Sequence, residues 1–322
     1  GTVGALLKGG FSGKAKVGIV IAGLVVIALL KVFDAKFWGV VVMGGAVIIL
    51  FFLFMALVAL SAGDMNLSIG AIGGMVAMFA GGMMEILGVP PLIAIAASLA
   101  LSVILGLING FLITRTGINS FIITLATSSI FTGIMLIVTK ADSFDSLPES
   151  FLTFSRQRTL GVALSPLFWI MIVAAVALSL FYSRTSLGRQ LLATGANRRA
   201  AQMSGLNVPG IIVRTHVLSA FLAGVAGIMS ALMLADAVPI IGTDWILGSF
   251  AATAVGGTVI TGGAVSVFGT VLGGLLIASI YNGVLLLNVS NFFVNFFLGL
   301  VLLIAVYLDR LRKVYAERTS LP

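Results

Sequence analysis

Residues 91–113, PLIAIAASLALSVILGLINGFLI, form a long apolar run that contains no charged side chain. A helix needs about 20 such residues to cross the hydrocarbon core of a lipid bilayer. The composition of the whole chain agrees, since 60% of its 322 residues are hydrophobic and only 9% are charged, against about 25% charged in a typical soluble domain. These features predict an all-α, polytopic integral membrane protein.

Similar runs recur along the chain and predict about ten membrane spans. The expected spans cover residues 17–33, 38–62, 68–87, 91–113, 118–139, 161–183, 210–235, 246–260, 264–287 and 291–308. Pro91 and Pro209 favour helix starts, because proline is well tolerated in the first turn of a helix. Asn119 is a weaker start signal.

The span 246–260 differs from the others because it is short and contains Gly256 and Gly257. This predicts a broken or re-entrant helix, which is tolerated at membrane depth only where its backbone is buried in protein or lines a cavity. Gly262 and Gly263 extend the glycine-rich stretch. We therefore expect these four glycines to mark the break.

Lysine and arginine indicate the orientation of the chain. With the N-terminus inside and the spans alternating, most basic residues fall on the cytoplasmic side and most acids fall outside, as the positive-inside rule requires. This predicts a cytoplasmic tail at 1–16, a transmembrane domain at 17–312 and a second cytoplasmic tail at 313–322. Residues 1–16 lack the pattern of a signal peptide. The same rule explains the net charge of +8, so nucleic-acid binding is not expected.

The longest cytoplasmic loop, 184–209, carries four arginines and no acid. Asn197 is a good N-cap, residues 198–204 can form about two helical turns, and Gly205 fits the left-handed position after a helix. Such a loop has two interpretations: a charge signal that sets topology, or a helix that docks a cytoplasmic partner. The caps favour the second, because a charge signal needs no defined helix.

Several classes of protein are excluded by what the chain lacks. It has no cysteine and a single histidine, His216, which predicts neither a thiolate nor a histidine-cluster metal site. It has no Gly-x-x-x-x-Gly-Lys-[Ser/Thr] phosphate loop, so it is not expected to hydrolyse ATP. We expect a transport protein with no catalytic residue, no metal and no cofactor of its own.

Two motifs carry a family resemblance. Residues 188–206, GRQLLATGANRRAAQMSGL, resemble the coupling-helix region of ribose-type ABC importer permeases. The pattern Gly-x-Asn-x-x-Ala-Ala-x-x-Ser-Gly is matched by Gly195, Asn197, Ala200, Ala201, Ser204 and Gly205, with Arg198 and Arg199 between them. Residues 251–263, AATAVGGTVITGG, are similar to the family's second signature. Gly273 and the pair Asn282-Gly283 continue the likeness, which runs from about residue 60 to 312.

The resemblance implies a fold like that of the type II ABC importers and a role in transport. In that family a pair of permeases, copies or paralogues, sits in the bacterial inner membrane. Cytoplasmic ABC ATPase subunits bind ATP and dock on the coupling helices. A periplasmic or lipid-anchored binding protein delivers a monosaccharide or related polyol, and alternating access moves it inward. Within the superfamily, the alternative solutes are a nucleoside, a branched-chain amino acid or a signalling furanose. A secondary carrier or channel is the alternative from another class.

The chain departs from the family before the third span. There the family usually reads Thr-Gly-Gly-Ile-Asp-Leu-Ser, whereas residues 62–68 read AGDMNLS. Asn66 stands where the acid is expected, and Asp64 stands where a glycine is expected. The acid has therefore moved by two residues, which bears on the choice of solute rather than on the class of protein.

Polar side chains inside the spans are the candidates for a translocation pathway. Charges there cost about 2.5–3.5 kcal/mol on insertion scales, and their scarcity in this chain disfavours a proton- or sodium-coupled carrier. The neutral residues Asn66, Ser68, Asn109 and Asn282 are expected to border the central cavity, since amides and hydroxyls suit sugar hydroxyls. Hydrogen bonds between helices are the alternative role for each. His216 is expected to be a packing residue rather than a proton relay.

Overall fold

The computed structural model describes residues 56–156, 166–259 and 261–286, with single residues between 296 and 307. Every regular element in these ranges is a helix, and residues 56–61 are the helical end of a segment that begins before them. Several predictions lie outside the described residues: the tails 1–16 and 313–322, the span 17–33, and most of the spans 38–62 and 291–308.

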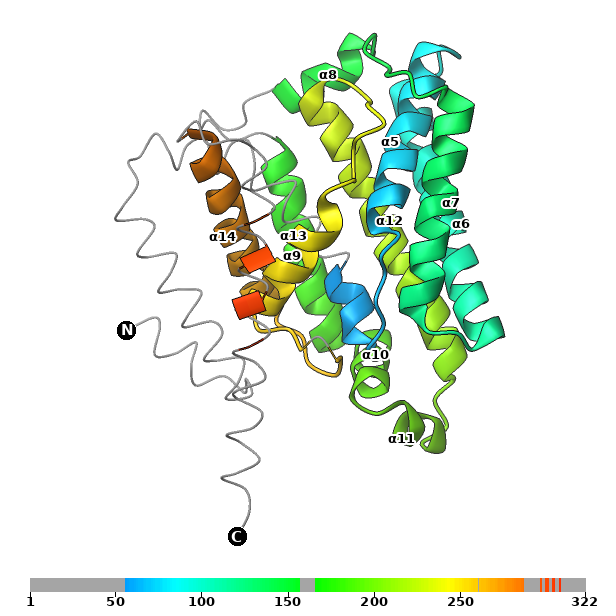
Figure 1. The fold of residues 1–322 in the computed structure, drawn as a ribbon, viewed down its shortest axis with the longest axis vertical. Coiled ribbons are helices and arrows are strands. Elements are labelled where there is room, and N and C mark those ends of the chain that lie inside the picture. Colours follow the sequence, from blue (N-terminus) through cyan, green and yellow to red (C-terminus); the bar gives the residue numbers. More distant parts are fainter. Residues whose placement is uncertain are drawn as a thin grey trace.

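The described helices follow the predicted order of spans. They are α5 (Ile69–Glu85), α6 (Pro91–Thr116), α7 (Ser120–Thr139), α8 (Glu149–Arg156), α9 (Pro166–Arg184), α10 (Ser186–Ala196), α11 (Arg198–Met203), α12 (Val208–Leu234), α13 (Trp245–Val255) and α14 (Val267–Leu286). In Figure 1, α5 and α12 form the centre of the bundle, α6 and α7 cover one side, and α9, α13 and α14 cover the other. The short α8 lies at one end, and α10 and α11 lie at the opposite end.

Local sequence explains where these helices begin. Helix α6 begins at Pro91, whose missing N–H costs nothing in a first turn. Asn119 caps α7, since its side-chain oxygen accepts a hydrogen bond from the backbone N of Phe121 at 2.9 Å. Asn207 caps α12 by accepting from the backbone N of Gly210 at 3.2 Å, and proline occupies the first turn. The three predicted helix starts are thereby confirmed.

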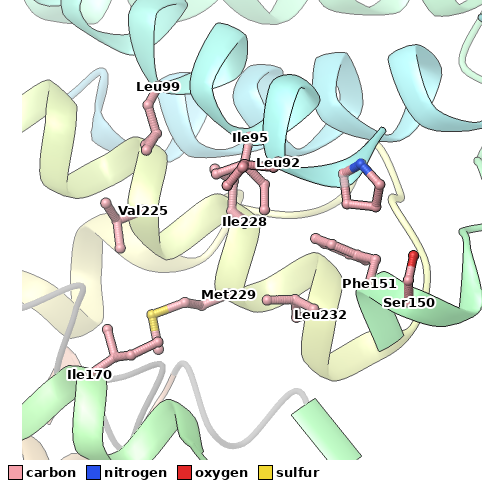
Figure 2. Close-up of a pocket in the computed structure, with 11 residues that line it drawn as sticks. Leu92, Ile95, Leu99, Ser150, Phe151, Ile170, Val225, Ile228, Met229 and Leu232 are labelled. Carbon is pink, nitrogen blue, oxygen red and sulfur yellow. The ribbon is translucent and has the colours of Figure 1, made fainter. Parts of the chain in front are cut away.

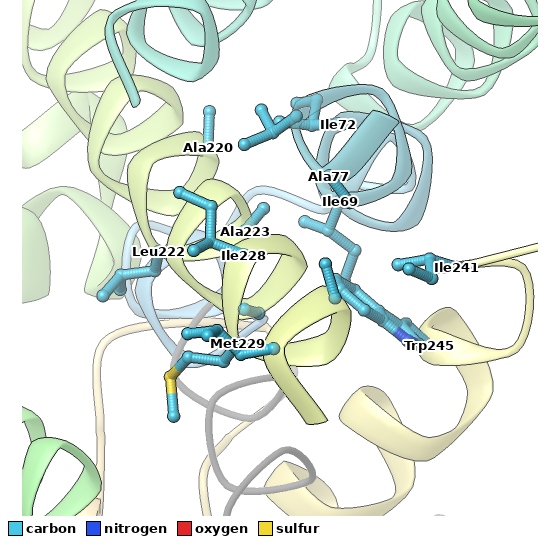
Figure 3. Close-up of a cluster of buried hydrophobic side chains, with 14 of the residues drawn as sticks. Ile69, Ile72, Ala77, Ala220, Leu222, Ala223, Ile228, Met229, Ile241 and Trp245 are labelled. Atoms are coloured by element: carbon cyan, nitrogen blue, oxygen red, sulfur yellow. The ribbon is translucent and has the colours of Figure 1, made fainter. Parts of the chain in front are cut away.

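Helix α12 crosses α5 at a pair of glycines. A Cβ added to Gly227 would overlap the carbonyl oxygen of Gly73 and lie 2.8 Å from its carbonyl carbon. Around this crossing, Figure 3 shows side chains of α5, among them Ile69 and Ile72, facing side chains of α12, with Trp245 beside them. Because lipid supplies no hydrophobic force between helices, close backbone packing of this kind holds the bundle together.

Helix lengths support a membrane protein. Among the described residues, α6, α7 and α12 are long and apolar enough to cross a bilayer, and α9 joined to α10 would make a fourth span with a bend of 74°. Helices α5, α13 and α14 are shorter apolar helices. The total of ten spans stays a prediction.

Candidate functional site

The predicted capped helix at the basic end of the bundle is confirmed as α11. The Asn197 side-chain oxygen accepts a hydrogen bond from the backbone N of Ala200 at 3.0 Å, and Gly205 follows the helix with φ +82°. The preceding helix α10 was not expected. Thr185 caps it by accepting from the backbone N of Gly188 at 3.0 Å. Thr185 was the signal for this second helix, because threonine is a preferred N-cap residue.

The residues of the predicted coupling helix divide into an outer and an inner set. Asn197, Arg199, Ala200, Ser204 and Gly205 are exposed. Ala201 is 5% exposed and packs in a small cluster with Ile113, Val208 and Ile212. The outer set can meet a partner, whereas Ala201 fixes α11 to the bundle.

Gly195 faces inward, to a place where three chain segments meet. A Cβ on Gly195 would overlap the carbonyl oxygen of Ser61 and lie 2.6 Å from the backbone N of Gly263. A Cβ on Gly262 would lie 2.6 Å from the backbone N of Gly63 and 3.0 Å from Cα of Gly195. We call Gly63, Gly195, Gly262 and Gly263 the glycine junction. The backbone N of Gly263 also donates to the carbonyl oxygen of Ser61 at 3.2 Å.

An ion pair lies beside the glycine junction. Nη2 of Arg198 donates to Oδ1 of Asp64 at 2.6 Å, and the side chains are 45% and 2% exposed, respectively. Nη2 also lies 3.5 Å from the carbonyl oxygen of Gly63. Sequence reasoning missed this pair, although the displaced acid at position 64 was the signal that pointed to it.

A polar cavity of about 460 Å³ opens next to this ion pair. Its lining includes Asp64, Arg198, Gln202, Asn119 and Thr114. The cavity lies between α11 and the loop that joins α6 to α7, so α11 is not packed against that loop along its whole length. Among the described residues, no three His, Cys, Asp or Glu side chains gather into a metal site.

Three of the four predicted pathway residues lie together in a buried network. Nδ2 of Asn66 donates to Oγ of Ser219 at 3.1 Å. The hydroxyl of Ser68 donates to Oδ1 of Asn66 at 2.7 Å, and Nδ2 of Asn109 donates to Oγ of Ser68 at 2.7 Å. The network thus joins the start of α5 to α6 and α12. The side chain of Asn282, on α14, lies outside the described residues.

The glycines predicted to mark a broken helix lie at the end of α13 and in the loop that follows it. The helix ends at Val255 with Gly256 as its cap, and a Cβ on Gly256 would lie 2.6 Å from the carbonyl carbon of Gly269. Gly257 and Gly262 have φ values of +82° and +92°, which favour glycine. The chain then turns back into α14. That residues 246–260 form a broken or re-entrant membrane span stays a prediction.

A second cavity, of about 390 Å³, lies near the opposite end of the bundle. Figure 2 shows it between α6, α8, α9 and α12, with Leu92, Phe151, Met229 and Leu232 among its lining residues. The side chains are almost all apolar. This chemistry does not suit a hydroxyl-rich solute.

The buried network leads to a first prediction. Asn109→Ala should lower the free energy of unfolding by about 0.5–1.5 kcal/mol, because it removes the buried hydrogen bond that joins α6 to Ser68. Ser102→Ala is the matched control on the same helix, since its hydroxyl donates to the carbonyl oxygen of Leu99 within that helix. Thermal unfolding in detergent measures both. Unchanged stability together with a changed uptake rate per folded molecule would show a pathway role instead.

In the described residues, a helical bundle with membrane-length helices and a capped, exposed basic helix at one end has the architecture of an integral membrane protein. The family model described as "Branched-chain amino acid transport system / permease component" matches residues 40–306. The chain belongs to this family of permease components. Together with the apolar helices, this membership indicates a bacterial inner-membrane protein.

Several curated relatives of the chain are named as sugar permeases. The ribose import permease protein RbsC of Bacillus subtilis is 36% identical over 77% of this chain and 77% of its own length. The D-allose transport system permease protein AlsC of Escherichia coli is 34% identical over 79% of this chain and 77% of its own length. The L-arabinose ABC transporter permease protein AraH of Azospirillum brasilense is 34% identical over 65% of this chain and 61% of its own length. No solved structure matches the chain.

Proposed function

We propose that this chain is the transmembrane permease subunit of an ATP-driven ABC importer for a monosaccharide or a related polyol. The observation that carries the proposal is the likeness to permeases for ribose and D-allose over more than three quarters of the chain. A solute-binding protein outside the membrane and ATPase subunits inside it would complete the transporter. The permease would pair with a second copy or a paralogue.

The outer set of α11 supplies the docking surface for the ATPase subunits. It is exposed, well capped and basic, and the cap gives the helix one defined geometry. ATP would bind on the partner subunit, because this chain carries no phosphate loop. Closure of the ATPase subunits would then move α11 and open the pathway on the other side of the membrane.

Orientation follows from the same assignment. If α11 meets cytoplasmic ATPase subunits, its end of the bundle is the cytoplasmic end, and both termini are cytoplasmic if the number of spans is even. The opposite end, with α8 and the loop before α13, then receives the binding protein. The charge distribution of the sequence supports this orientation.

Two classes of solute, a monosaccharide and an amino acid, are candidates for transport by this permease. The family model is named for branched-chain amino acid transport, whereas the relatives at 34–36% identity are named for sugars. The pathway residues Asn66, Ser68, Asn109 and Asn282 are neutral, and neutral amides and hydroxyls suit a polyol better than a zwitterion. We therefore favour a monosaccharide over an amino acid.

Uptake by a reconstituted transporter tests this function. The permease would be reconstituted in vesicles with the ATPase and binding protein that accompany it, and the uptake of labelled D-ribose, D-allose, L-arabinose and L-leucine would be compared. We expect ATP-dependent uptake of at least one sugar and none of leucine. Leucine uptake without sugar uptake would overturn the assignment of the solute, and uptake that needs no ATP would overturn the class.

A matched pair of variants tests the docking surface. Ala200→Glu places a charge on the exposed face of α11, and it should lower ATP-dependent uptake about tenfold or more, because a charge buried at a packed contact without a partner costs more than 1.4 kcal/mol. Ser183→Glu makes a similar change at the exposed end of α9 and should leave uptake near the native rate. Equal uptake by both variants would contradict docking through α11.

A further inference from the structure

We propose that Asp64 is a positioning residue that fixes α11 to the start of α5, and that with the glycine junction it makes one clamp. The clamp consists of Asp64, Arg198 and the four glycines of the junction. It would carry the movement of α11 directly to α5 and to the loop between α13 and α14. This inference rests on the proposed function, since it takes α11 to be the helix that the ATPase subunits move.

The burial of Asp64 is the first step of the argument. Its side chain is 2% exposed, and its Oδ1 accepts a hydrogen bond from Arg198 at 2.6 Å. The other oxygen, Oδ2, is buried and has no hydrogen-bond partner among the described residues. A buried carboxylate that lost its cation would be strongly unfavourable. Any movement of α11 that separated the pair would therefore be opposed, and α11 and residue 64 are expected to move together.

The position of Asp64 in the chain is the second step. It lies two residues before Asn66, which bonds to Ser219 of α12 and accepts from Ser68 at the start of α5. Asn109 of α6 joins the same network through Ser68. A force on Asp64 therefore reaches α5, α6 and α12 through short, buried hydrogen bonds, with no long side chain between them to absorb the displacement.

The glycine junction is the third step, and it adds the remaining helices. Gly195 at the end of α10 lies in backbone contact with residues 61 and 62 and with Gly263. Gly263 lies in the loop between α13 and α14 and donates its N–H to Ser61 at 3.2 Å. Contacts between backbones are stiff, because no rotamer can change to relieve them. The glycine junction thus connects the end of α10 to residues 61–63, which precede α5, and to the loop between α13 and α14.

The ion pair of the clamp depends on the position at which this chain departs from the family pattern. The acid stands at position 64 rather than at position 66. Only at position 64 does it meet Arg198 in this structure, whereas Asn66 is committed to the network around Ser68. The shift of two residues therefore places the acid of this chain in an ion pair with α11.

Spin-label distances in the purified permease test the clamp without any transport measurement. The chain has no cysteine, so Met203→Cys on α11 and Ile122→Cys on α7 provide one pair of labels per chain, at residues that are 83% and 58% exposed, and dilution with unlabelled chain suppresses distances between copies. We expect a narrow distance distribution in the parent protein. Asp64→Asn and Arg198→Gln should both broaden this distribution. Asp64→Glu should keep it narrow, because glutamate keeps the charge and Arg198 has room to adjust.

Two control variants make the same chemical changes away from the clamp. Asp145→Asn removes an exposed acid, and Arg189→Gln removes an exposed arginine of α10. Neither should change the distance distribution. If Asp64→Asn does not fold, Arg198→Gln carries the test, since Arg198 is half-exposed. A distribution in Arg198→Gln as narrow as in the parent protein overturns the clamp.

The second readout is the ATP hydrolysed per sugar molecule taken up by the reconstituted transporter. If the clamp positions α11, this ratio should rise about fivefold in Arg198→Gln, in line with a partly exposed ion pair. In Asp64→Glu the ratio should stay at the parent value. A broadened distance with an unchanged ratio shows that the pair does not serve transport and overturns the proposal. If the parent protein takes up no sugar, the proposed function fails, and the distances alone decide on the clamp.

Discussion

Gly195→Ala is expected to disable transport, because it places a methyl group inside the glycine junction. The added Cβ would overlap the carbonyl oxygen of Ser61 and lie 2.6 Å from the backbone N of Gly263. Overpacking of a well-packed site costs about 1–3 kcal/mol even where side chains can move, and here the neighbours are backbone atoms. Either α10 is displaced or the junction opens, and each result separates α11 from the helices it would drive.

Uptake per folded molecule, with thermal unfolding measured in parallel, checks this expectation. Gly133→Ala on α7 is the matched control, since nothing lies within 4 Å of the Cβ that it adds. It should leave both quantities unchanged or raise stability slightly. The expectation about Gly195 fails if its alanine variant takes up sugar at the native rate with native stability.

This result would also refine the role of Gly195. The family resemblance places Gly195 in the coupling-helix region, on which the ATPase subunits dock in that family. In the structure Gly195 points into the bundle, whereas Ala200 is exposed. Gly195→Ala should therefore leave binding of the ATPase subunit largely intact while uncoupling transport, and Ala200→Glu should weaken that binding.

Gly227→Leu should prevent the bundle from assembling. Its side chain would enter the crossing of α5 and α12, where a Cβ alone overlaps the carbonyl oxygen of Gly73. The two helices would have to separate along their whole contact, at a cost well above the about 1–3 kcal/mol of ordinary overpacking. Small residues at such crossings are what allow helices to associate in lipid.

The yield of monodisperse protein after extraction in detergent measures this effect. Gly133→Leu makes the same change on an open face of α7 and should give a normal yield. Gly227→Ala is an intermediate case, expected to fold with a lower unfolding temperature. A native yield and unfolding temperature for Gly227→Leu would show that the crossing does not hold the bundle together.

Local sequence was sufficient for the class of protein and for the helix caps. Partition into lipid depends on composition over about 20 residues, so the run 91–113 predicted α6 without any tertiary information. A cap depends on a side chain and a backbone N–H two or three residues away. Asn119, Asn197 and Asn207 therefore lie at helix starts for reasons that are visible in the sequence. The family motif in 188–206 likewise gave the class of transporter.

Local sequence was not sufficient for the arrangement of the candidate site. Helix α10 and the bend of 74° before it were missed, because the basic stretch 184–209 was assigned to a loop, and the direction of α10 depends on its contacts with α9 and α12. The four pathway candidates were chosen as neutral polar residues in spans. Three of them proved to bond to one another, and a hydrogen bond between Asn109 and Ser68 joins residues 41 positions apart.

Composition and short-range contacts thus determined that this chain is a helical membrane protein and where the capped helix α11 begins and ends, and the motif in 188–206 gave the family. Tertiary packing alone determined that Gly195 and Ala201 face inward, that the glycine junction exists, and that Asp64 meets Arg198, 134 residues away. The physical reason is the range of each interaction. Lipid partition and helix capping act within a few turns of one helix, whereas an ion pair or a backbone contact between loops depends on how distant helices pack.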